Sequence, residues 1–357
     1  MFVAWRDLRF AKGRFVLIGT VVTLITLLVG FLTGLTAGLA DQSISAVTSI
    51  SADRIVFGGP STGAQLSYAD SAVTAKDAAA WKGRAGIETV RPLGISQGRI
   101  TAPGTQQSVT IFGARAGFDA STPAAHGHIT LPKNTATALK VSAGDTVKLA
   151  GSSYVVDTVT ADSWYSHMPV VRTTLADWQH VAASTGNTHA FATVLAVTGS
   201  GDTDYAAADK ATGTSSSGIL QSLTALGSFR SEIGSLLLMV AMLFGISALV
   251  VGAFFTVWGI QRQPDVAVLK ALGASNRMLV VDALGQAAIV LVLGVAVGIG
   301  LTAVLGSLAG NGIPFILNPL TTLLPAAAMI ALGLAGAAFA LRSVTNADPL
   351  TALGSNR

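Results

Sequence analysis

The stretch FVLIGTVVTLITLLVGFLTGLTAGLA at residues 15–40 decides the fold of this 357-residue chain, because it contains no Asp, Glu, Lys or Arg. Two other stretches, 233–261 and 283–341, share this property. A helix needs about 20 consecutive apolar residues to cross the core of a bilayer. Each of the first two stretches therefore predicts one membrane-spanning helix, and the third is long enough for two.

The composition agrees with a membrane protein. The chain is 51% hydrophobic and only 11% charged, and its mean hydropathy of +0.60 is far above that of a soluble domain of this size. It has no cysteine, which excludes thiolate metal sites and cysteine nucleophiles. A domain of about 190 residues buries enough surface to fold without disulfides, so export of such a domain is not excluded.

The charges indicate which side of the membrane each part occupies. Residues 41–231 contain 13 basic and 13 acidic residues and are therefore neutral. The other basic residues all flank helix ends on one side of a four-helix layout: Arg6, Arg9, Lys12, Arg14, Arg262, Lys270, Arg277, Arg342 and Arg357. By the positive-inside rule this side is the cytoplasm. Both termini are therefore expected on the cytoplasmic side of the cell membrane. The pI of about 9.5 thus reflects topology, and no nucleic-acid partner is expected.

The predicted fold class is a polytopic α-helical membrane protein with four transmembrane helices and one α+β extracytoplasmic domain between helices 1 and 2. The expected segments are an amphipathic interfacial helix (1–14), transmembrane helix 1 (15–40), the extracytoplasmic domain (41–231), transmembrane helix 2 (232–261), a short cytoplasmic helix (262–278), transmembrane helix 3 (279–308), an outer turn (309–319), transmembrane helix 4 (320–342) and a cytoplasmic tail (343–357).

Two features of the N-terminal region allow more than one interpretation. Residues 1–14 have an apolar and a basic side at helical spacing, and they could instead be the start of a signal peptide. The 26-residue apolar run that follows exceeds the length of a signal-peptide core, about 7–15 residues, and favours an uncleaved span. Gly30, Gly34 and Gly38 lie on nearly one helix face and permit close approach of another helix, although such spacing also arises by chance.

The extracytoplasmic domain shows both strand and helix patterns. Strands are expected at 54–57, 87–91, 99–101, 108–112, 146–149, 154–158, 169–172 and 191–197, and helices at 72–81, 135–139 and 175–183. The polar stretch Thr198 to Gly218, rich in small residues, predicts a flexible return to the membrane.

The sequence contains little catalytic chemistry. No Gly-Lys dipeptide occurs, so the chain has no phosphate-binding G-x-x-x-x-G-K-[ST] loop and is not itself an ATPase. His126 and His128 could hold a metal, but a histidine pair in a loop is more often solvated. After the second span, Pro264 suits the first position of a helix, Asp265 complements its N-terminus, and Gly273 can end it. We expect no enzyme activity, no intrinsic cofactor and no metal site.

This short helix carries the main motif of a known family. Its residues Asp265, Val268, Leu269, Lys270, Leu272 and Gly273, followed by Ala274-Ser275, resemble the coupling motif of MacB/FtsX-type ABC transporter permeases. The C-terminal Asp348-Pro349-x-x-Ala352-Leu353 and the segment 139–147 also resemble elements of that family. The family usually has Glu where this chain has Asp265. The resemblance covers the whole chain and includes the order of spans and outer domain.

The resemblance implies a permease dimer with two copies of a separate ABC ATPase subunit, in contact with membrane lipid. Cargo would enter from the outer leaflet, and ATP binding would close the dimer and expel it. The sequence of residues 263–270 looks most like that of haem-exporter permeases of the HrtB type and the related DevC-type permeases. This resemblance makes haem the expected transported ligand. Export of a peptide, lipoprotein or drug, and FtsX-like mechanical signalling to cell-wall hydrolases, remain alternatives.

Two clusters are candidates for cargo binding. Glu232 is the one acidic residue at the outer end of a span, next to Phe229 and Arg230, so it could ligate haem iron while Arg230 binds a propionate. A plain alternative is a carboxylate favoured by the helix dipole. In the second cluster Tyr165, His167 and Met168 are possible haem ligands, although the pattern favours a structural role for them in a strand. Met239 and Met242 would line the apolar wall of the Glu232 site, between the paired permeases.

Overall fold

The computed structural model describes residues 12–59, 65–261, 268, 270, 273–309 and 313–345. It divides into two compact units, which we call the membrane unit (Met1–Gly38 and Ser235–Arg357) and the inserted domain (Leu39–Gly234). The predicted interfacial helix at 1–11, most of the short helix at 262–272 and the C-terminal Asp-Pro-x-x-Ala-Leu motif lie outside the described residues.

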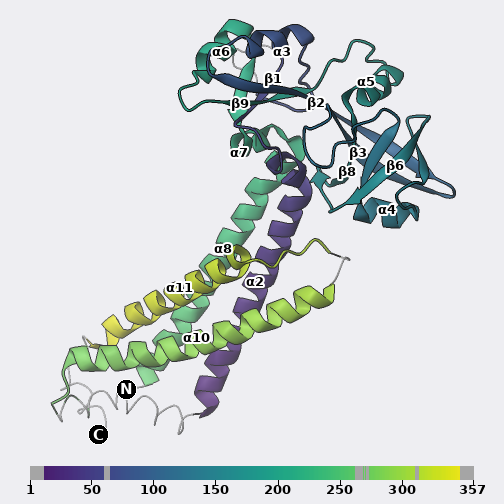
Figure 1. Cartoon of the computed structure of the whole chain (residues 1–357). Coiled ribbons are helices and arrows are strands. Elements are labelled where there is room, and N and C mark those ends of the chain that lie inside the picture. The colour runs from purple at the N-terminus through teal and green to yellow at the C-terminus, as the bar shows by residue number, and fades with distance from the viewer. Residues whose placement is uncertain are drawn as a thin grey trace. The chain divides into compact units, whose positions relative to one another are not determined.

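Four long helices account for the predicted spans (Figure 1). They are α2 (Lys12–Thr48), α8 (Gly227–Gln261), α10 (Asn276–Ala309) and α11 (Pro319–Thr345). Each contains a segment long and apolar enough to cross a membrane. The predicted fold class is confirmed: four candidate spans, with an α/β domain between the first and the second. Helix α2 runs eight residues beyond the predicted end at residue 40, because a single charged residue such as Asp41 does not interrupt a backbone hydrogen-bond ladder.

The membrane unit has its own apolar core, to which all four helices contribute. Val22 of α2, Phe255 of α8, Leu291 of α10 and Met329 of α11 are each at most 3% exposed. Small residues allow close contact between α2 and α10. A Cβ added to Gly294 would lie 2.8 Å from the Val22 side chain, and one added to Gly298 would lie 2.7 Å from Thr26.

The glycine face of α2 is covered by a segment of the same chain that is not helical. Gly38 lies against the carbonyl of Pro314, so that an added Cβ would stand 2.0 Å from its oxygen. Gly34 lies against the ring of Phe315, which also packs on Gly306 of α10. Close approach was expected from a helix; the structure places residues 313–318, which form neither helix nor strand, there instead. Residues 310–312 of the predicted outer turn are not described.

The inserted domain is organised around one long strand, β2 (Ile87–Ala102). Its first half pairs with β9 and its second half with β3. The other strands are β1 (Arg54–Phe57), β3 (Thr105–Ala114), β4 (His128–Pro132), β5 (Thr146–Leu149), β6 (Ser152–Thr160), β7 (Trp164–Tyr165), β8 (Met168–Thr174), β9 (Val194–Gly199) and β10 (Ser215–Gly218).

The strands form one continuous sheet with a closed part and an open part. Strand β5 pairs back with β2 at Ile100 and Thr101, so β2, β3, β8, β4, β6 and β5 close into a ring. The first half of β2 continues through β9, β1 and β10 as an open sheet. Closure removes the exposed edges that would otherwise invite pairing with other chains.

Helices cover the sheets through buried aromatic residues. The helices of the domain are α3 (Ala75–Lys82), α4 (Lys133–Leu139), α5 (Leu175–Ser184), α6 (Tyr205–Thr212) and α7 (Ile219–Ser222), followed by the 3₁₀ turn η1 (Leu223–Ala225). Trp178 of α5 fills the space that side chains at Gly94 and Gly113 would occupy, since an added Cβ at either would stand 2.1 Å from it. Its indole N–H donates to Ser96 at 3.0 Å, so both the apolar and the polar part of the tryptophan are satisfied.

Most of the strands follow the predicted pattern, but one prediction is wrong. Residues 198–218 do not form a flexible linker: they contain the end of β9, helix α6 and strand β10. Asp204 caps α6 by accepting from the Ala207 N–H at 2.9 Å. Asp209 then accepts from the N–H and the hydroxyl of Ser216, at 2.9 and 2.7 Å. Polar side chains that resembled a solvated linker here satisfy backbone groups and hold β10 in the sheet.

Candidate functional site

The structure brings the two predicted cargo-binding clusters together within the inserted domain. The hairpin of β7 and β8 presents His167 to the first turns of α8. There, both carboxylate oxygens of Glu232 lie near the His167 Nε2 atom, at 2.9 and 3.1 Å. The two side chains are 33% and 41% exposed, so the pair is accessible to solvent. The sequence analysis placed Glu232 and His167 in separate candidate clusters. In the fold they belong to one site.

His167 belongs to a strained turn. The two residues between β7 and β8, Ser166 and His167, have φ angles of 49° and 62°. Both values lie in the left-handed region, which non-glycine residues seldom adopt and which costs about 1 kcal/mol or more for each. The turn is held by its neighbours: the hydroxyl of Ser43 in α2 lies 3.0 Å from the same His167 Nε2.

The surroundings of Tyr165 are those of a residue packed in the domain core and not those of a haem ligand. It is 6% exposed, and its ring meets Tyr68 and Phe112 edge to face at 6.0 and 5.7 Å. Burial raises the pKa of the Tyr165 phenol above its ordinary value of 10.0, and neighbouring Tyr68 acts in the same direction. A phenol kept neutral in this way is a poor anionic ligand for a metal at neutral pH.

A cavity of about 300 Å³ lies beside the turn, at the lower end of the range for ligand pockets of about 300–1,000 Å³. Its wall combines apolar and polar groups: Gln65, Leu66, Ser67, Tyr68, Ala69, Asp70, Gln97, Tyr165, Ser166, Ala225, Leu226, Gly227 and Arg230. Two of these residues, Arg230 and Tyr165, were predicted from the sequence as candidates for cargo binding. An arginine in a wall of mixed polarity suits a ligand that carries a carboxylate on a partly apolar body.

The remaining predicted cargo residues differ in their surroundings. Phe229 is partly buried and packs against the domain core, which leaves part of its surface accessible. Met168 is half-buried and pairs with Tyr165 in the β7–β8 hairpin. Met239 and Met242 lie further along α8 with 50% and 59% of their surface exposed. No contact joins these methionines to Glu232 among the interactions described.

The predicted ATPase-coupling residues are described only in part. Asp265, Leu269 and Leu272 lie outside the described residues. Val268 is 59% exposed, and Lys270 is half-buried. Gly273 has a φ of 93°, and its N–H donates to the Lys270 carbonyl at 3.0 Å. A positive φ of this kind is the conformation in which a glycine can end a helix.

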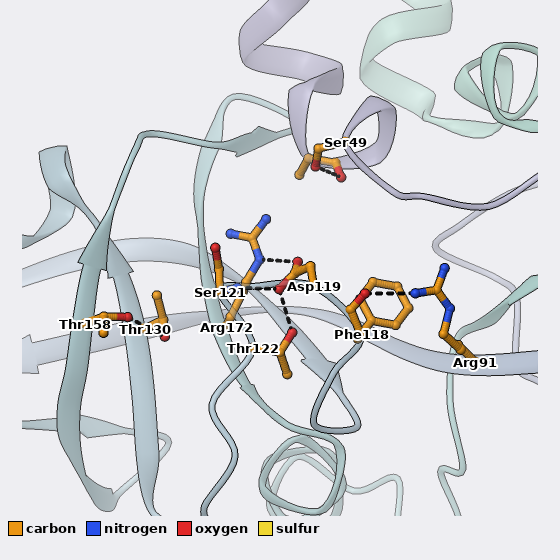
Figure 2. A network of polar contacts seen from close by, with 10 residues as sticks. Ser49, Arg91, Phe118, Asp119, Ser121, Thr122, Thr130, Thr158 and Arg172 are labelled. Carbon is orange, nitrogen blue, oxygen red and sulfur yellow. Dashed lines mark hydrogen bonds and ion pairs between the residues drawn. The ribbon is translucent and has the colours of Figure 1, made fainter.

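A second polar network stabilises the loop between β3 and β4 (Figure 2). Arg172 of β8 donates to Asp119 at 2.9 Å, and Asp119 also accepts from Thr122 and the Ser121 N–H. Arg91 of β2 donates to the Phe118 carbonyl at 2.9 Å. Arg172 is 8% exposed, and the long loop is therefore anchored from two strands. These contacts are turned inward and serve the fold.

No metal centre is formed by the residues that the structure describes, where no group of three or more His, Cys, Asp or Glu is placed to hold an ion. His126 and His128 each lie near one aspartate instead, at 3.6 Å from Asp177 and 3.5 Å from Asp157.

Several residues of the site were not predicted. Ser43 and Ser45 of α2, Ser166 of the turn and Ser228 of α8 all contact one another or the hairpin backbone. Serines in a chain rich in serine and threonine give no signal of their own. The predicted end of the first span at residue 40 also hid the fact that Ser43 and Ser45 lie on a helix.

Comparison with known proteins shows which proteins the chain is similar to. Residues 237–349 match the model of the FtsX-like permease C-terminal family. A protein of Staphylococcus haemolyticus, whose provisionally assigned name is hemin transport system permease protein HrtB, is 25% identical over 361 residues, covering 99% of both chains. A protein of the same name from Staphylococcus epidermidis is 24% identical over 290 residues, or 78% of both chains.

Among solved structures, the periplasmic region of MacB from Actinobacillus actinomycetemcomitans is similar to 48% of this chain and 91% of its own, with 11% identity and a TM-score of 0.35. A TM-score at this level adds nothing to the assignment. The family match, the two relatives and the four candidate spans give the same answer. Residues 237–349 match the FtsX-like permease family, the chain as a whole is similar to permeases named for hemin transport, and its four candidate spans make it a multi-pass membrane protein.

Proposed function

We propose that this permease exports haem or a similar amphiphile. In this proposal both termini are cytoplasmic and the inserted domain is outside the cell. Two copies of the chain form a dimer in the membrane with two ATPase subunits. Cargo enters from the outer leaflet, and closure of the dimer on ATP binding expels it. The relatives named for hemin transport, which match up to 99% of the chain, support haem as the cargo.

The observation that carries the proposal is the placement of charged groups where α8 begins. Arg230 lines the cavity, and Glu232 lies two residues further on, against His167. Helix α8 then continues as a candidate membrane span. A carboxylate and an imidazole are ligands for haem iron, and an arginine binds propionates. The site therefore offers complementary groups to the two polar parts of haem, next to apolar surface.

A surface for the second copy is available on α8. The apolar stretch of α8 is 11% buried within the membrane unit, against 28–33% for the other three spans. Large side chains along it, including Leu238, Ile246 and Leu249, are more than half exposed. In a membrane this surface faces lipid or protein, and we assign it to the permease dimer.

The test is haem-dependent activity of the complex. The permease, purified with its ATPase subunit in lipid nanodiscs, should hydrolyse ATP faster when haem is added, and a strain that lacks the permease should become sensitive to haem. Absence of both effects would reject haem as cargo. A division or chaining defect with normal haem tolerance would instead support mechanical signalling to cell-wall hydrolases.

A further inference from the structure

The tip of the β7–β8 hairpin is fastened to the C-terminal part of α2. The backbone N–H of Ser166 donates to the Ser43 carbonyl at 3.0 Å, and that of His167 donates to the Gln42 carbonyl at 2.9 Å. One strand residue adds a third contact, because the Trp164 N–H donates to the Ser45 hydroxyl at 3.0 Å. Three backbone N–H groups of the hairpin, those of Trp164, Ser166 and His167, thus donate to the same helix end.

The same two turn residues also hold the first turns of α8. The Ser228 hydroxyl donates to the Ser166 hydroxyl at 3.0 Å. The His167 Nε2 atom lies 2.9 Å from a Glu232 carboxylate oxygen and 3.0 Å from the Ser43 hydroxyl. A single ring nitrogen therefore stands between a side chain of α2 and a side chain of α8. Because the carboxylate is the stronger acceptor, the Nε2 hydrogen is directed at Glu232.

The conformation of the turn does not explain why position 167 is a histidine. A two-residue hairpin loop with both residues left-handed prefers Asn-Gly, since these residues adopt positive φ easily. Ser166 and His167 adopt φ angles of 49° and 62° in spite of their side chains. Backbone strain of this kind persists only where surrounding contacts enforce it, and it concentrates at functional positions.

The hairpin cannot move independently of the inserted domain. Strand β8 pairs with both β3 and β4 in the closed ring. Tyr165, immediately before the turn, is buried among aromatic rings. The two helices that the turn holds are themselves unbroken, α2 from Lys12 to Thr48 and α8 from Gly227 to Gln261, and each contains a candidate span.

We propose that the Ser166–His167 turn is a clamp that fixes the end of α2 to the start of α8, and that His167 is the positioning residue that also orients the Glu232 carboxylate. A displacement of either helix is then passed to the other and to the strand ring. The clamp stays closed while the helices move. The transport consequence rests on the proposed function, whereas the clamp itself does not.

The first experiment measures the clamp without reference to cargo. His167→Gly removes the imidazole at a position where glycine relieves the turn, so misfolding is not expected. In the full-length permease in nanodiscs, amides at 42–48 and 227–233 should exchange with deuterium about threefold faster than in the wild type, the effect of losing the partly exposed imidazole and its hydrogen bonds. His189→Gly, at an exposed loop histidine, should leave exchange unchanged. Unchanged exchange in His167→Gly would overturn the clamp.

The second experiment tests whether the clamp stays closed during turnover. Ser166→Cys with Ser228→Cys should form a disulfide, because the two hydroxyl oxygens are 3.0 Å apart and the native chain has no cysteine. The oxidised complex should retain the haem-stimulated ATPase rate of the reduced one, while His167→Gly should lose at least half of the stimulation.

Inactivation by the disulfide, with recovery on reduction, would show that the hairpin leaves α8 during the cycle and would overturn the proposal. A wild-type complex without haem stimulation would reject the proposed function alone, since the exchange result on the clamp stands by itself.

Discussion

The backbone N–H of Ile316 donates a hydrogen bond of 3.1 Å to the carbonyl oxygen of Gly34, inside helix α2. Non-helical backbone at membrane depth is tolerated only where its polar groups find partners in the protein. The missing side chains of Gly34 and Gly38 let residues 314–316 come close enough for this bond. The segment after α10 is thereby fixed to the first span.

We expect Gly38→Ala to destabilise the membrane unit, because the added Cβ would stand 2.0 Å from the Pro314 carbonyl oxygen. The cost of such overpacking is about 1–3 kcal/mol. Thermal unfolding in detergent, followed by tryptophan fluorescence, measures it. Gly19→Ala is the matched control in the same helix, where an added Cβ meets nothing within 4 Å. Equal melting temperatures for the two variants would contradict the close packing.

Glu232→Gln should weaken haem binding by about tenfold or more, because a neutral amide is a poor ligand for iron. Glutamine still accepts a hydrogen bond from His167, so the contact between α8 and the hairpin is kept. A haem titration followed by the Soret absorption measures the change. Asp70→Asn, which removes another carboxylate from the wall of the adjacent cavity, provides a control. If Glu232→Gln binds haem with wild-type affinity, Glu232 does not ligate haem and serves only as the hydrogen-bond partner of His167.

The proposed topology can be tested by labelling, because the native chain has no cysteine. Asp145→Cys lies in an exposed turn of the inserted domain and should react with a membrane-impermeant maleimide in intact cells. A cysteine at Ser355, in the proposed cytoplasmic tail, should react only after permeabilisation. The reverse pattern would overturn the proposed orientation.

Leu269→Asp or Leu272→Asp should abolish co-purification of the ATPase subunit, because a charge would disrupt the proposed apolar contact of the coupling motif. The permease should still insert, which its yield in the membrane fraction would show. Leu220→Asp, at a leucine of the inserted domain with 75% of its surface exposed, is the control and should retain the ATPase. Retention of the ATPase by both coupling variants would remove the motif from the interface.

Stability should fall at alkaline pH through the buried tyrosines. Burial raises the pKa of Tyr165 above 10.0, so the folded state keeps the proton that the unfolded state releases. The stabilisation is present below pH 10 and is lost above it, by about 1.4 kcal/mol per pH unit for each such group. Tyr165→Phe keeps the ring contacts and should show a shallower fall in melting temperature between pH 10 and 11. Parallel curves would mean that another group controls the alkaline transition.

Sequence patterns predicted the parts of this molecule that depend on local spacing. The spans follow from long uncharged runs, and β1 and β5 have the predicted bounds because apolar and polar residues alternate between turn residues. The contact between His167 and Glu232 joins positions 65 residues apart, which no local pattern can reveal. Residues 204–218 were misjudged because their order depends on hydrogen bonds to Asp209 and not on apolar periodicity.

Strand β1 has a consequence for how the protein is made. Its neighbours in the sheet are β9, at residues 194–199, and β10, at residues 215–218, both about 140–160 residues later in the chain. During synthesis β1 must therefore wait, with both edges unpaired, until almost the whole domain has emerged. Pairing between such distant segments is slow, because a long loop must close first. The newly made domain is therefore expected to need protection from aggregation until β10, which ends at Gly218, has been synthesised and can pair with β1.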